Sequence, residues 1–357
     1  MTTPSPFTYE ALPMRVRLGP GAVAQLSEEI TGAGLQRVLI LCSPEQQDVG
    51  ESIATALGDQ AAEVYPHARM HGPVEVAAAA RERARQLGAD GCVAVGGGSA
   101  IGLGKAIALE HGLPIIAVPT TYAGSEMTTV WGLTDNGRKR TGKDRRVLPV
   151  SVLYDPELTI SLPPQVSATS GMNALAHAVE ALYAPDSSPI INLMAEEGVR
   201  ALYTALPAVV ADGTDLEART EALYGAWLCG ACLGATTMSL HHKLCHTLGG
   251  MFDLPHAATH TVVLPHALAY NQPEAPRAVA ALKRALDINS DPATALWELA
   301  GRLGAPRSLH ELGMAESAID AAIEAAMTSP YANPRPVTTE GLRHLLSAAW
   351  AGKPPTT

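Results

Sequence analysis

Short apolar runs alternate with helix-forming segments in the first half of the chain, and this alternation restricts the fold more than any other feature. The runs at residues 37–41, 91–95 and 113–118 predict buried strands, and the Ala- and Arg-rich segment 73–87 predicts a helix. A last strand is predicted at residues 147–154. Strands separated by helices form parallel βαβ units, in which helices cover both faces of the sheet.

The second half of the chain has a different composition, because strand patterns end near residue 160 and Ala, Leu, His and Glu then dominate. Helices are predicted at residues 167–183, 190–206, 216–248, 276–286, 292–303, 315–327 and 339–351. We therefore predict an α/β domain at residues 1–160, with a parallel sheet, and an all-helical domain at residues 161–357. A cleft between two such domains is where a ligand is expected to bind.

Charge and cysteine content exclude several classes of protein. Lys and Arg number 25 and Asp and Glu number 35, so the net charge of −10 argues against binding to nucleic acid or to an anionic membrane. No apolar run reaches the roughly 18 residues that span a bilayer, and the first residues lack a signal-peptide pattern. The five cysteines are odd in number and lie in apolar stretches, which favours reduced thiols in a cytoplasmic protein. The Cys229-x-x-Cys232 pair is expected to serve helix packing rather than zinc or redox chemistry.

A glycine-rich loop follows the second predicted strand and precedes a helix. Gly96, Gly97 and Gly98 allow the backbone to approach a pyrophosphate closely, and the N–H groups and dipole at the helix start would hold its negative charge. Ser99 is expected to cap that helix. The loop predicts a nucleotide site, and the alternative is a tight turn without a ligand.

A second polar loop follows the next predicted strand. It carries Thr120, Thr121, Tyr122 and Ser125, and a glycine lies between the last two. Because the carboxyl ends of parallel strands meet at one edge of the sheet, both loops are expected side by side, where open α/β sheets bind their ligands.

Histidines concentrate in the second half: six of the twelve fall between residues 241 and 266. His242 and His246 are spaced i, i+4 and share a helix face, which is expected to end at Gly249-Gly250, and the same spacing relates Asn173 and His177 upstream. His256 begins the next predicted helix. These side chains predict a metal site or a proton-transfer site. A structural role is the interpretation favoured for three further members of the group: His241, His260 and His266.

Seven motifs follow one another along the chain: Gly19–Ala22, the GGGS loop, the PTT…GSE loop, Asp155–Leu158, Gly171–Glu180, Pro255-His256 and Asn333-Pro334-Arg335. In this order they resemble the iron-containing alcohol dehydrogenase family, which shares its fold with dehydroquinate synthase. The resemblance implies a Rossmann-like N-terminal domain that binds a nicotinamide cofactor, a helical C-terminal domain that carries the catalytic histidines, and an active site in the cleft between them.

Two departures from the family pattern bear on cofactor and metal. Metal-dependent members hold a divalent ion with an aspartate and three histidines, and the matching positions here are Asn173, His177, His242 and His256. An amide supplies no charge, so no essential metal is expected. Ser43 replaces the acid that often ends the first strand and binds the adenosine ribose, so NADPH is expected to serve as well as NADH.

These departures, together with the segments PTTYAGSEMT, KRTGKDRRVLP and HHKLCHTLGG, resemble a branch of the family that reduces maleylacetate to 3-oxoadipate in the bacterial breakdown of aromatic compounds. The resemblance implies a small dicarboxylate substrate, a homodimer and no essential metal. Hydride would add to the double-bond carbon beside the terminal carboxylate, which leaves an enolate. The imidazoles of His242 and His246, with His177 and His256 nearby, are expected to stabilise the enolate and to supply the proton.

Three basic side chains are further candidates. Lys243 and Arg335 are expected to bind the substrate carboxylates, with Asn173 as a neutral donor, and Lys139 could reach the cofactor ribose. For Lys243 and Lys139, a solvated lysine without such a role is an equal alternative. The competing functions are a metal-dependent alcohol or polyol dehydrogenase of the same fold, a dehydroquinate synthase-like lyase, and a non-catalytic helical interaction protein.

Overall fold

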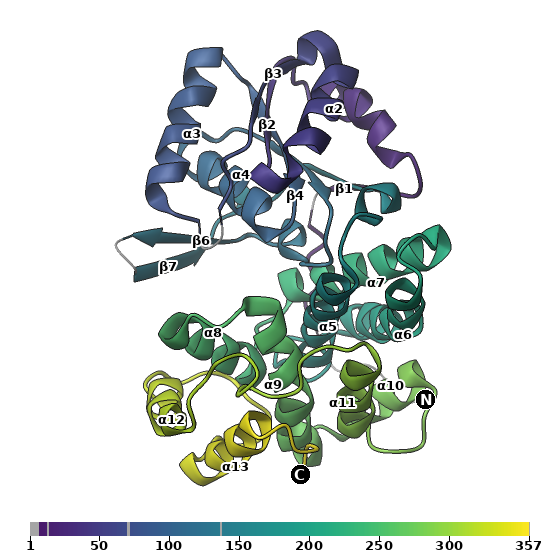
Figure 1. The fold of residues 1–357 in the computed structure, drawn as a ribbon, viewed down its shortest axis with the longest axis vertical. Coiled ribbons are helices and arrows are strands. Elements are labelled where there is room, and N and C mark those ends of the chain that lie inside the picture. Colours follow the sequence, from purple (N-terminus) through teal and green to yellow (C-terminus); the bar gives the residue numbers. More distant parts are fainter. Residues whose placement is uncertain (1–6, 13, 70–71, 136–137, 357) are drawn as a thin grey trace. The chain divides into compact units, whose positions relative to one another are not determined.

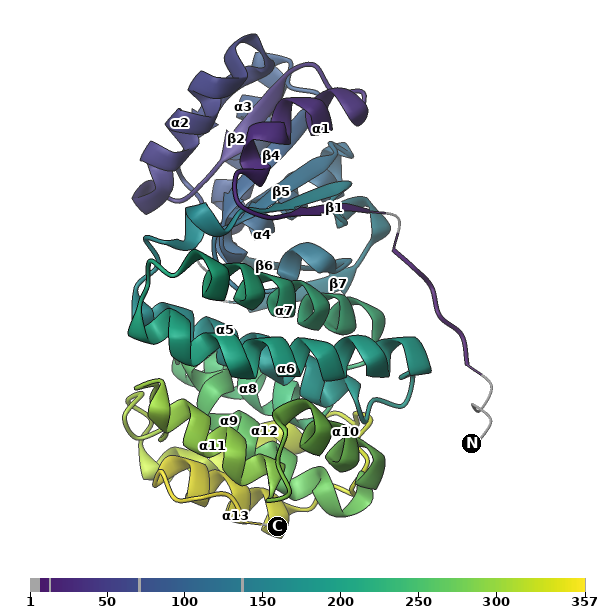
Figure 2. The same cartoon turned by 90° about the vertical axis from the view of Figure 1, so that its right-hand side faces the viewer.

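The computed structural model describes residues 7–12, 14–69, 72–135 and 138–356 (Figures 1 and 2). The chain forms two compact units. One is the α/β unit, Ala11–Leu162, and the other is the helical unit, Pro163–Thr357, to which the described residues 7–10 also belong. Each unit is described by itself below.

The α/β unit is built on a six-stranded parallel sheet with strand order β1-β8-β5-β4-β2-β3. Its strands are β1 (Arg15–Leu18), β2 (Val38–Leu41), β3 (Ala61–Tyr65), β4 (Gly91–Gly96), β5 (Ile115–Pro119) and β8 (Ser151–Tyr154). A separate antiparallel hairpin consists of β6 (Val130–Asp135) and β7 (Arg138–Lys143). The predicted parallel sheet is therefore confirmed.

Helices cover both faces of this sheet. Successive residues of a strand point to opposite faces, so alternate residues of β2 pack against different helices. Val38 and Ile40 pack with α1 (Leu26–Gly32) and α2 (Gln47–Leu57). Leu39 and Leu41 pack on the other face, with α3 (Val74–Leu87) and α4 (Gly98–His111) (Figure 1). Because β2 and β4 are covered on both faces, they are continuous runs of buried residues.

The helical unit contains nine α-helices among its described residues. They are α5 (Pro164–Ala181), α6 (Pro189–Ala211), α7 (Leu216–Ala235), α8 (Leu240–Phe252), α9 (His256–Asn271), α10 (Pro276–Leu286), α11 (Pro292–Arg302), α12 (Ile319–Met327) and α13 (Thr339–Trp350). Apolar residues of α8, α9, α12 and α13 share one core.

The prediction of one helix over residues 216–248 is wrong. The chain breaks between α7 and α8, whose axes differ by 94°. Thr236 adopts extended backbone angles, so α7 ends there. The hydroxyl of Thr236 donates to the carbonyl of Cys232 in the last turn of α7. The expected end at Gly249-Gly250 is also wrong, because α8 continues to Phe252 and ends at Asp253 in the left-handed region. No single helix among the described residues is long and apolar enough to cross a membrane.

Asp155 explains two of the sequence motifs that lie far apart in the chain. Its fully buried carboxylate accepts hydrogen bonds from the backbone N–H groups of Gly21, at 3.2 Å, and Val23, at 3.0 Å. It also accepts from the N–H of Glu157, at 3.1 Å, at the start of the turn that follows β8. The Gly19–Ala22 and Asp155–Leu158 motifs therefore meet in one structural contact.

Candidate active site

The two predicted cofactor loops leave the sheet side by side. Gly96 of β4 pairs with Pro119 of β5, and the N–H of Thr120 donates to the carbonyl of Gly96 at 3.2 Å. Gly96 has a φ of +140°, and a Cβ there would lie 2.5 Å from Oε1 of Gln46. The backbone conformation therefore favours glycine, and a larger residue would also displace the Gln46 side chain.

The expectation that Ser99 caps the following helix is wrong. Gly97 occupies the cap position of α4 and makes no side-chain cap hydrogen bond, while Ser99 is already the second helical residue. Gly98 is exposed, and a Cβ added to it would meet nothing within 4 Å. The start of a 14-residue helix thus offers N–H groups and open space, which suits a pyrophosphate.

The predicted residues of the second loop differ in their exposure. Thr120 is buried and accepts a hydrogen bond of 2.6 Å from Nε2 of Gln46. Tyr122 is fully buried, whereas Thr121 and Ser125 are half-buried. Thr121 and Ser125 are therefore the better placed of the four to contact a ligand.

A buried lysine ties α4 to the segment that follows this loop. The ammonium of Lys105 donates to the carbonyls of Thr128 and Val130, both at 2.7 Å, and to the hydroxyl of Thr128 at 2.9 Å. Burial lowers the pKa of Lys105 to about 7, although the charge of Glu126 acts in the opposite direction. Because each of the three ammonium donors meets an oxygen, the helix and the start of β6 are held together.

The turn that follows β2 contains a carboxylate, Glu45, that sequence reasoning missed. Ser43 is half-buried, and its hydrogen bond lowers the pKa of the exposed Glu45. A negative charge is therefore present two residues beyond the position where Ser43 replaces the usual acid. Lys139 lies in β7 opposite Thr134, and its side chain lies outside the described part of the structure.

In the helical unit, α5, α8 and α9 bring six imidazoles together, which we call the histidine cluster. Its members are His177, His241, His242, His246, His256 and His260. The ring centroids of His177 and His242 lie 5.2 Å apart, and those of His256 and His260 lie 4.3 Å apart. The four predicted catalytic histidines therefore belong to one cluster, as their spacing suggested.

His241 and His260, for which the sequence favours a structural role, are fully buried members of this cluster, and their role stays a prediction. The His260 ring lies 4.8 Å from that of His241 and 5.0 Å from that of His242. Sequence spacing from His256 by i, i+4 could have identified His260. His266 is also buried, but it lines a cavity with residues of α13 and is not a member of the cluster.

Glu180 organises the start of α8. Its fully buried carboxylate accepts hydrogen bonds from the N–H groups of Ser239, at 2.9 Å, and His241, at 2.7 Å. It also lies 2.7 Å from Nδ1 of His242. A carboxylate only accepts, so we assign the Nδ1 proton to His242, and its Nε2 then carries the lone pair when the ring is neutral. Glu180 therefore caps a helix and orients a predicted catalytic imidazole at the same time.

Several buried polar atoms around the cluster have no hydrogen-bond partner among the described residues. They are Oδ1 of Asn173, Nδ1 of His177, Nε2 of His242 and both ring nitrogens of His260. Buried polar atoms are rarely left unpaired, so these atoms indicate where a polar ligand binds. His246 and His256 are exposed and give the cluster a side that is accessible to solvent.

Burial keeps the inner imidazoles neutral. It lowers the pKa values of His177, His242 and His260 well below the ordinary value, and neighbouring imidazoles add to the effect. Burial likewise lowers the pKa of His241 to about 3. Burial raises the pKa of Glu180, opposed by His241 and by the backbone N–H groups that the carboxylate accepts.

The residues at the family's metal position include an amide in place of a carboxylate, and whether they hold an ion stays a prediction. In the described part of the chain, two other groups bring their ligand atoms within 4.8 Å of one another. These groups are Glu180–His241–His242 and His241–Cys245–His260. The set of His177, His242 and His256 is not among them, and Asn173 contributes an uncharged oxygen.

The two predicted carboxylate-binding residues contact aromatic rings. The Lys243 ammonium lies 5.7 Å from the ring centroid of Tyr331. The Arg335 guanidinium lies 4.5 Å from the ring centroid of Tyr270 and donates to the carbonyl of Tyr270 at 2.9 Å. These contacts anchor the Asn333-Pro334-Arg335 motif to α9, and binding of substrate by either residue stays a prediction.

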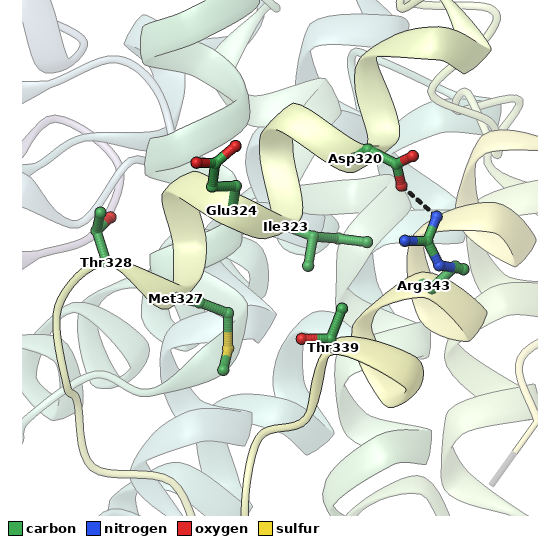
Figure 3. Close-up of a pocket in the computed structure, with 7 residues that line it drawn as sticks. All are labelled: Asp320, Ile323, Glu324, Met327, Thr328, Thr339 and Arg343. Carbon is green, nitrogen blue, oxygen red and sulfur yellow. Dashed lines mark hydrogen bonds and ion pairs between the residues drawn. The ribbon is translucent and has the colours of Figure 1, made fainter.

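Two cavities of the helical unit lie away from the histidine cluster. One, of about 340 Å³, lies between α12 and α13, where Asp320 and Arg343 form an ion pair (Figure 3). Another, of about 370 Å³, is lined by residues that include His266, Arg335 and His344. Neither contains a member of the histidine cluster.

We predict that Glu180→Gln releases His242 from its single tautomer. The glutamine side chain has one oxygen acceptor in place of two, and its NH₂ group is a donor. This oxygen would have to serve both the backbone N–H groups that start α8 and Nδ1–H of His242, so the hydrogen bond to His242 is weakened. The ¹⁵N NMR shifts of Nδ1 and Nε2 of His242 should move toward each other, and the free energy of unfolding should fall by roughly 1–3 kcal/mol. Glu197→Gln, which alters an exposed pair with Arg200, is the control. Unchanged His242 signals in Glu180→Gln would contradict the assigned role.

The buried histidines also predict an acid-sensitive stability. His177, His241, His242, His260 and His266 have lowered pKa values in the folded protein and titrate near 6.5 when unfolded. The unfolded chain therefore binds more protons below that pH. Stability is retained above pH 6.5 and is lost as the pH falls toward 4, by at least about 1.4 kcal/mol per pH unit.

Urea unfolding followed by tryptophan fluorescence measures this slope, because three of the four tryptophans lie in the helical unit. His260→Asn should reduce the slope, whereas His310→Ala, which changes an exposed histidine, should not. Equal stability at pH 7.5 and pH 5.5 would refute the prediction.

Comparison with known proteins agrees with this architecture. A model of "Iron-containing alcohol dehydrogenase" matches residues 13–156, and one of "Fe-containing alcohol dehydrogenase family, C-terminal" matches residues 167–350. The chain is 55% identical to a maleylacetate reductase from Burkholderia cepacia over 98% of this chain and 99% of the relative. The crystal structure of maleylacetate reductase from Agrobacterium tumefaciens has a TM-score of 0.95 and 50% identity, covering 98% of this chain and 100% of that one.

A more distant structure contains a nicotinamide cofactor. Sulfoacetaldehyde reductase from Bifidobacterium kashiwanohense in complex with NAD⁺ has a TM-score of 0.87 and 25% identity, covering 97% of this chain and 99% of that one. The two family models together match most of the chain, one in each unit. The chain therefore belongs to the iron-containing alcohol dehydrogenase family.

Proposed function

We propose that the protein is an oxidoreductase that reduces the carbon–carbon double bond of maleylacetate to give 3-oxoadipate, with NADH or NADPH as the hydride donor. The observation that carries this proposal is the 55% identity to a maleylacetate reductase over nearly the full length of both chains. The histidine cluster supports it, because the reaction needs a proton donor and stabilisation of an oxyanion. A homodimer in the bacterial cytoplasm is part of the same proposal.

The cofactor's pyrophosphate would bind at the start of α4. The exposed Gly98 and the N–H groups of the first turn suit this role, with the half-buried Thr121 and Ser125 on the neighbouring loop. The relative from Bifidobacterium kashiwanohense was crystallised with NAD⁺, which supports nicotinamide binding by this fold.

In the reaction, hydride from the nicotinamide adds to the double-bond carbon that bears the terminal carboxylate. The double bond shifts toward the ketone, whose oxygen becomes an enolate. A proton then adds to the carbon beside the ketone, and 3-oxoadipate results. The protein's part is to stabilise the enolate oxygen and to deliver this proton.

His242 is the imidazole best placed for this work. Its unpartnered Nε2 is buried, and its Nδ1 is held 2.7 Å from the Glu180 carboxylate. In the neutral ring Nε2 carries no proton, so a proton must first reach it from the exposed side of the cluster, and burial opposes this step. The buried Glu180 carboxylate on Nδ1 would stabilise the resulting imidazolium, whose Nε2–H can then donate to the enolate oxygen and give up its proton. His246 and His256 lie at the exposed side of the cluster and would connect it to solvent.

A metal is not required by this scheme. When bound in other family members, a divalent ion would polarise the substrate oxygen. Here Asn173 replaces the charged ligand, so we propose that imidazoles perform that task. The alternative is a metal-dependent alcohol or polyol dehydrogenase of the same fold, in which Asn173 still coordinates the ion.

The decisive measurement is oxidation of NADH with maleylacetate by enzyme treated exhaustively with a strong chelator. We expect full activity, and we expect His242→Ala to lower kcat about 10²- to 10⁴-fold, with a smaller loss for His246→Ala. His310→Ala, an exposed histidine outside the cluster, should leave kcat unchanged. Activity that is lost on chelation and restored by iron or zinc would instead support the metal-dependent alternative. If neither state of the enzyme reduces maleylacetate, the proposed substrate is wrong.

Glu45 provides a test of cofactor choice. Its exposed carboxylate follows β2, where this class of fold binds the adenosine ribose, and it would repel a 2′-phosphate. We expect Glu45→Gln to raise the kcat/KM ratio of NADPH over NADH about fivefold. The control is Glu51→Gln, an exposed carboxylate on α2. An unchanged ratio would show that Glu45 does not face the ribose.

A further inference from the structure

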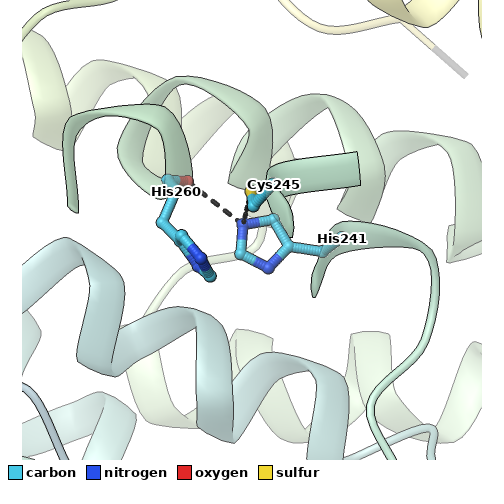
Figure 4. Close-up of side chains that lie close together, drawn as sticks. All are labelled: His241, Cys245 and His260. Atoms are coloured by element: carbon cyan, nitrogen blue, oxygen red, sulfur yellow. Dashed lines mark hydrogen bonds between the residues drawn. The ribbon is translucent and has the colours of Figure 1, made fainter. Parts of the chain in front are cut away.

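A trio of soft and borderline ligands lies on the inner side of the histidine cluster. We propose that His241, Cys245 and His260 form a binding site for a thiophilic divalent ion such as Zn²⁺, with one thiolate and two imidazole ligands (Figure 4). The site is distinct from the family's metal position, which has no sulfur ligand. It does not depend on the proposed reaction.

The geometry of the trio matches a tetrahedral ion. His241 and Cys245 lie one turn apart on α8, and Sγ of Cys245 is 3.5 Å from Nε2 of His241. Zn–S and Zn–N bonds of about 2.3 and 2.0 Å place two ligand atoms of one tetrahedral ion about 3.5 Å apart. The ligand atoms of all three side chains lie within 4.8 Å of one another, so binding needs only small movements of the side chains.

His260 supplies an independent indication of a ligand. Its ring is fully buried, and neither Nδ1 nor Nε2 has a hydrogen-bond partner among the described residues. A buried neutral imidazole normally satisfies at least one nitrogen, because an unpaired polar atom loses its hydration without compensation. Coordination of an ion would use one of these nitrogens.

The charges around the trio balance a divalent ion. On binding, the Cys245 thiol releases its proton to solvent and becomes a thiolate. Together with the carboxylate of Glu180, which lies within 4.8 Å of a ring nitrogen of His241, it offsets the two positive charges. A buried ion without such compensation would be costly.

One existing contact must change. Nε2 of His241 lies 3.1 Å from the carbonyl of His260, so Nε2–H is the donor in the metal-free protein (Figure 4). Coordination through Nε2 moves the ring proton to Nδ1, which lies 3.4 Å from Nδ1 of His242. Both Nδ1 protons would then have to share the Glu180 carboxylate, which already accepts from His242.

Two exposed imidazoles border the buried trio. His256 is exposed, and its ring centroid lies 4.3 Å from that of His260. His246, also exposed, lies 6.4 Å from His260 by the same measure. The route proposed for the ion passes these two imidazoles.

The experiment is titration of the full-length, reduced protein with Co²⁺ in the absence of oxygen, followed by absorption spectroscopy. Cobalt occupies zinc sites, and a thiolate ligand produces a sulfur-to-cobalt charge-transfer band in the near ultraviolet. We expect this band at one Co²⁺ per chain and its loss in Cys245→Ser. His260→Asn should weaken Co²⁺ binding at least tenfold.

Matched variants separate this site from its neighbours. Cys229→Ser removes another fully buried thiol of the helical unit and should keep the band, as should His177→Ala at the family's metal position. Circular dichroism and thermal melting confirm that each variant is folded. A wild-type spectrum without the band, or a band that survives Cys245→Ser, overturns the proposal. A third outcome also overturns the proposal: cobalt absorption that lacks the sulfur-to-cobalt band and is lost in His177→Ala. This result would assign the ion to the family's metal position.

Discussion

The arrangement of the histidine cluster depends on one buried carboxylate. Glu180, on α5, accepts from the first N–H groups of α8 and holds Nδ1 of His242. A helix that starts inside a protein must find acceptors for these N–H groups, and here they come from another helix. The same contact fixes how α5 and α8 approach each other, and therefore where the imidazoles meet.

In the α/β unit, the first N–H groups of α4 are not capped by a side chain. There the cap position is a glycine without a side-chain acceptor, so the first N–H groups remain available to an anionic ligand. One helix start is closed by a carboxylate and orients a side chain, while the other is open and suits a phosphate. The difference follows from which residues surround each helix start.

Much of the fold could be predicted from the sequence, because the buried strands are continuous apolar runs and most helices have clear periodicity. The strands β1 and β3 were not identified, since each is short and includes charged residues at the sheet's edges. The break before α8 could not be predicted from periodicity, because the N–H groups that start α8 are accepted by Glu180, and Ser239 and Glu180 are 59 positions apart. For the same reason, helix spacing grouped His242 with His246 but could not show that His241 turns inward, whereas the i, i+4 spacing from His256 could have indicated His260. Glu45 was overlooked because the sequence comparison considered only position 43, where the family has its acid. The structure shows that β2 ends at Leu41 and that Glu45 lies in the turn that follows.

Lys105 has a consequence for the thermodynamics of cofactor binding. Its three hydrogen bonds join α4, which begins at the glycine loop, to the first residues of the β6–β7 hairpin. The conformational entropy of this part of the hairpin is therefore lost when the unit folds, and not when a nucleotide arrives. A ligand that binds at the start of α4 meets a segment that is already ordered, so less of its interaction free energy is consumed by ordering the protein.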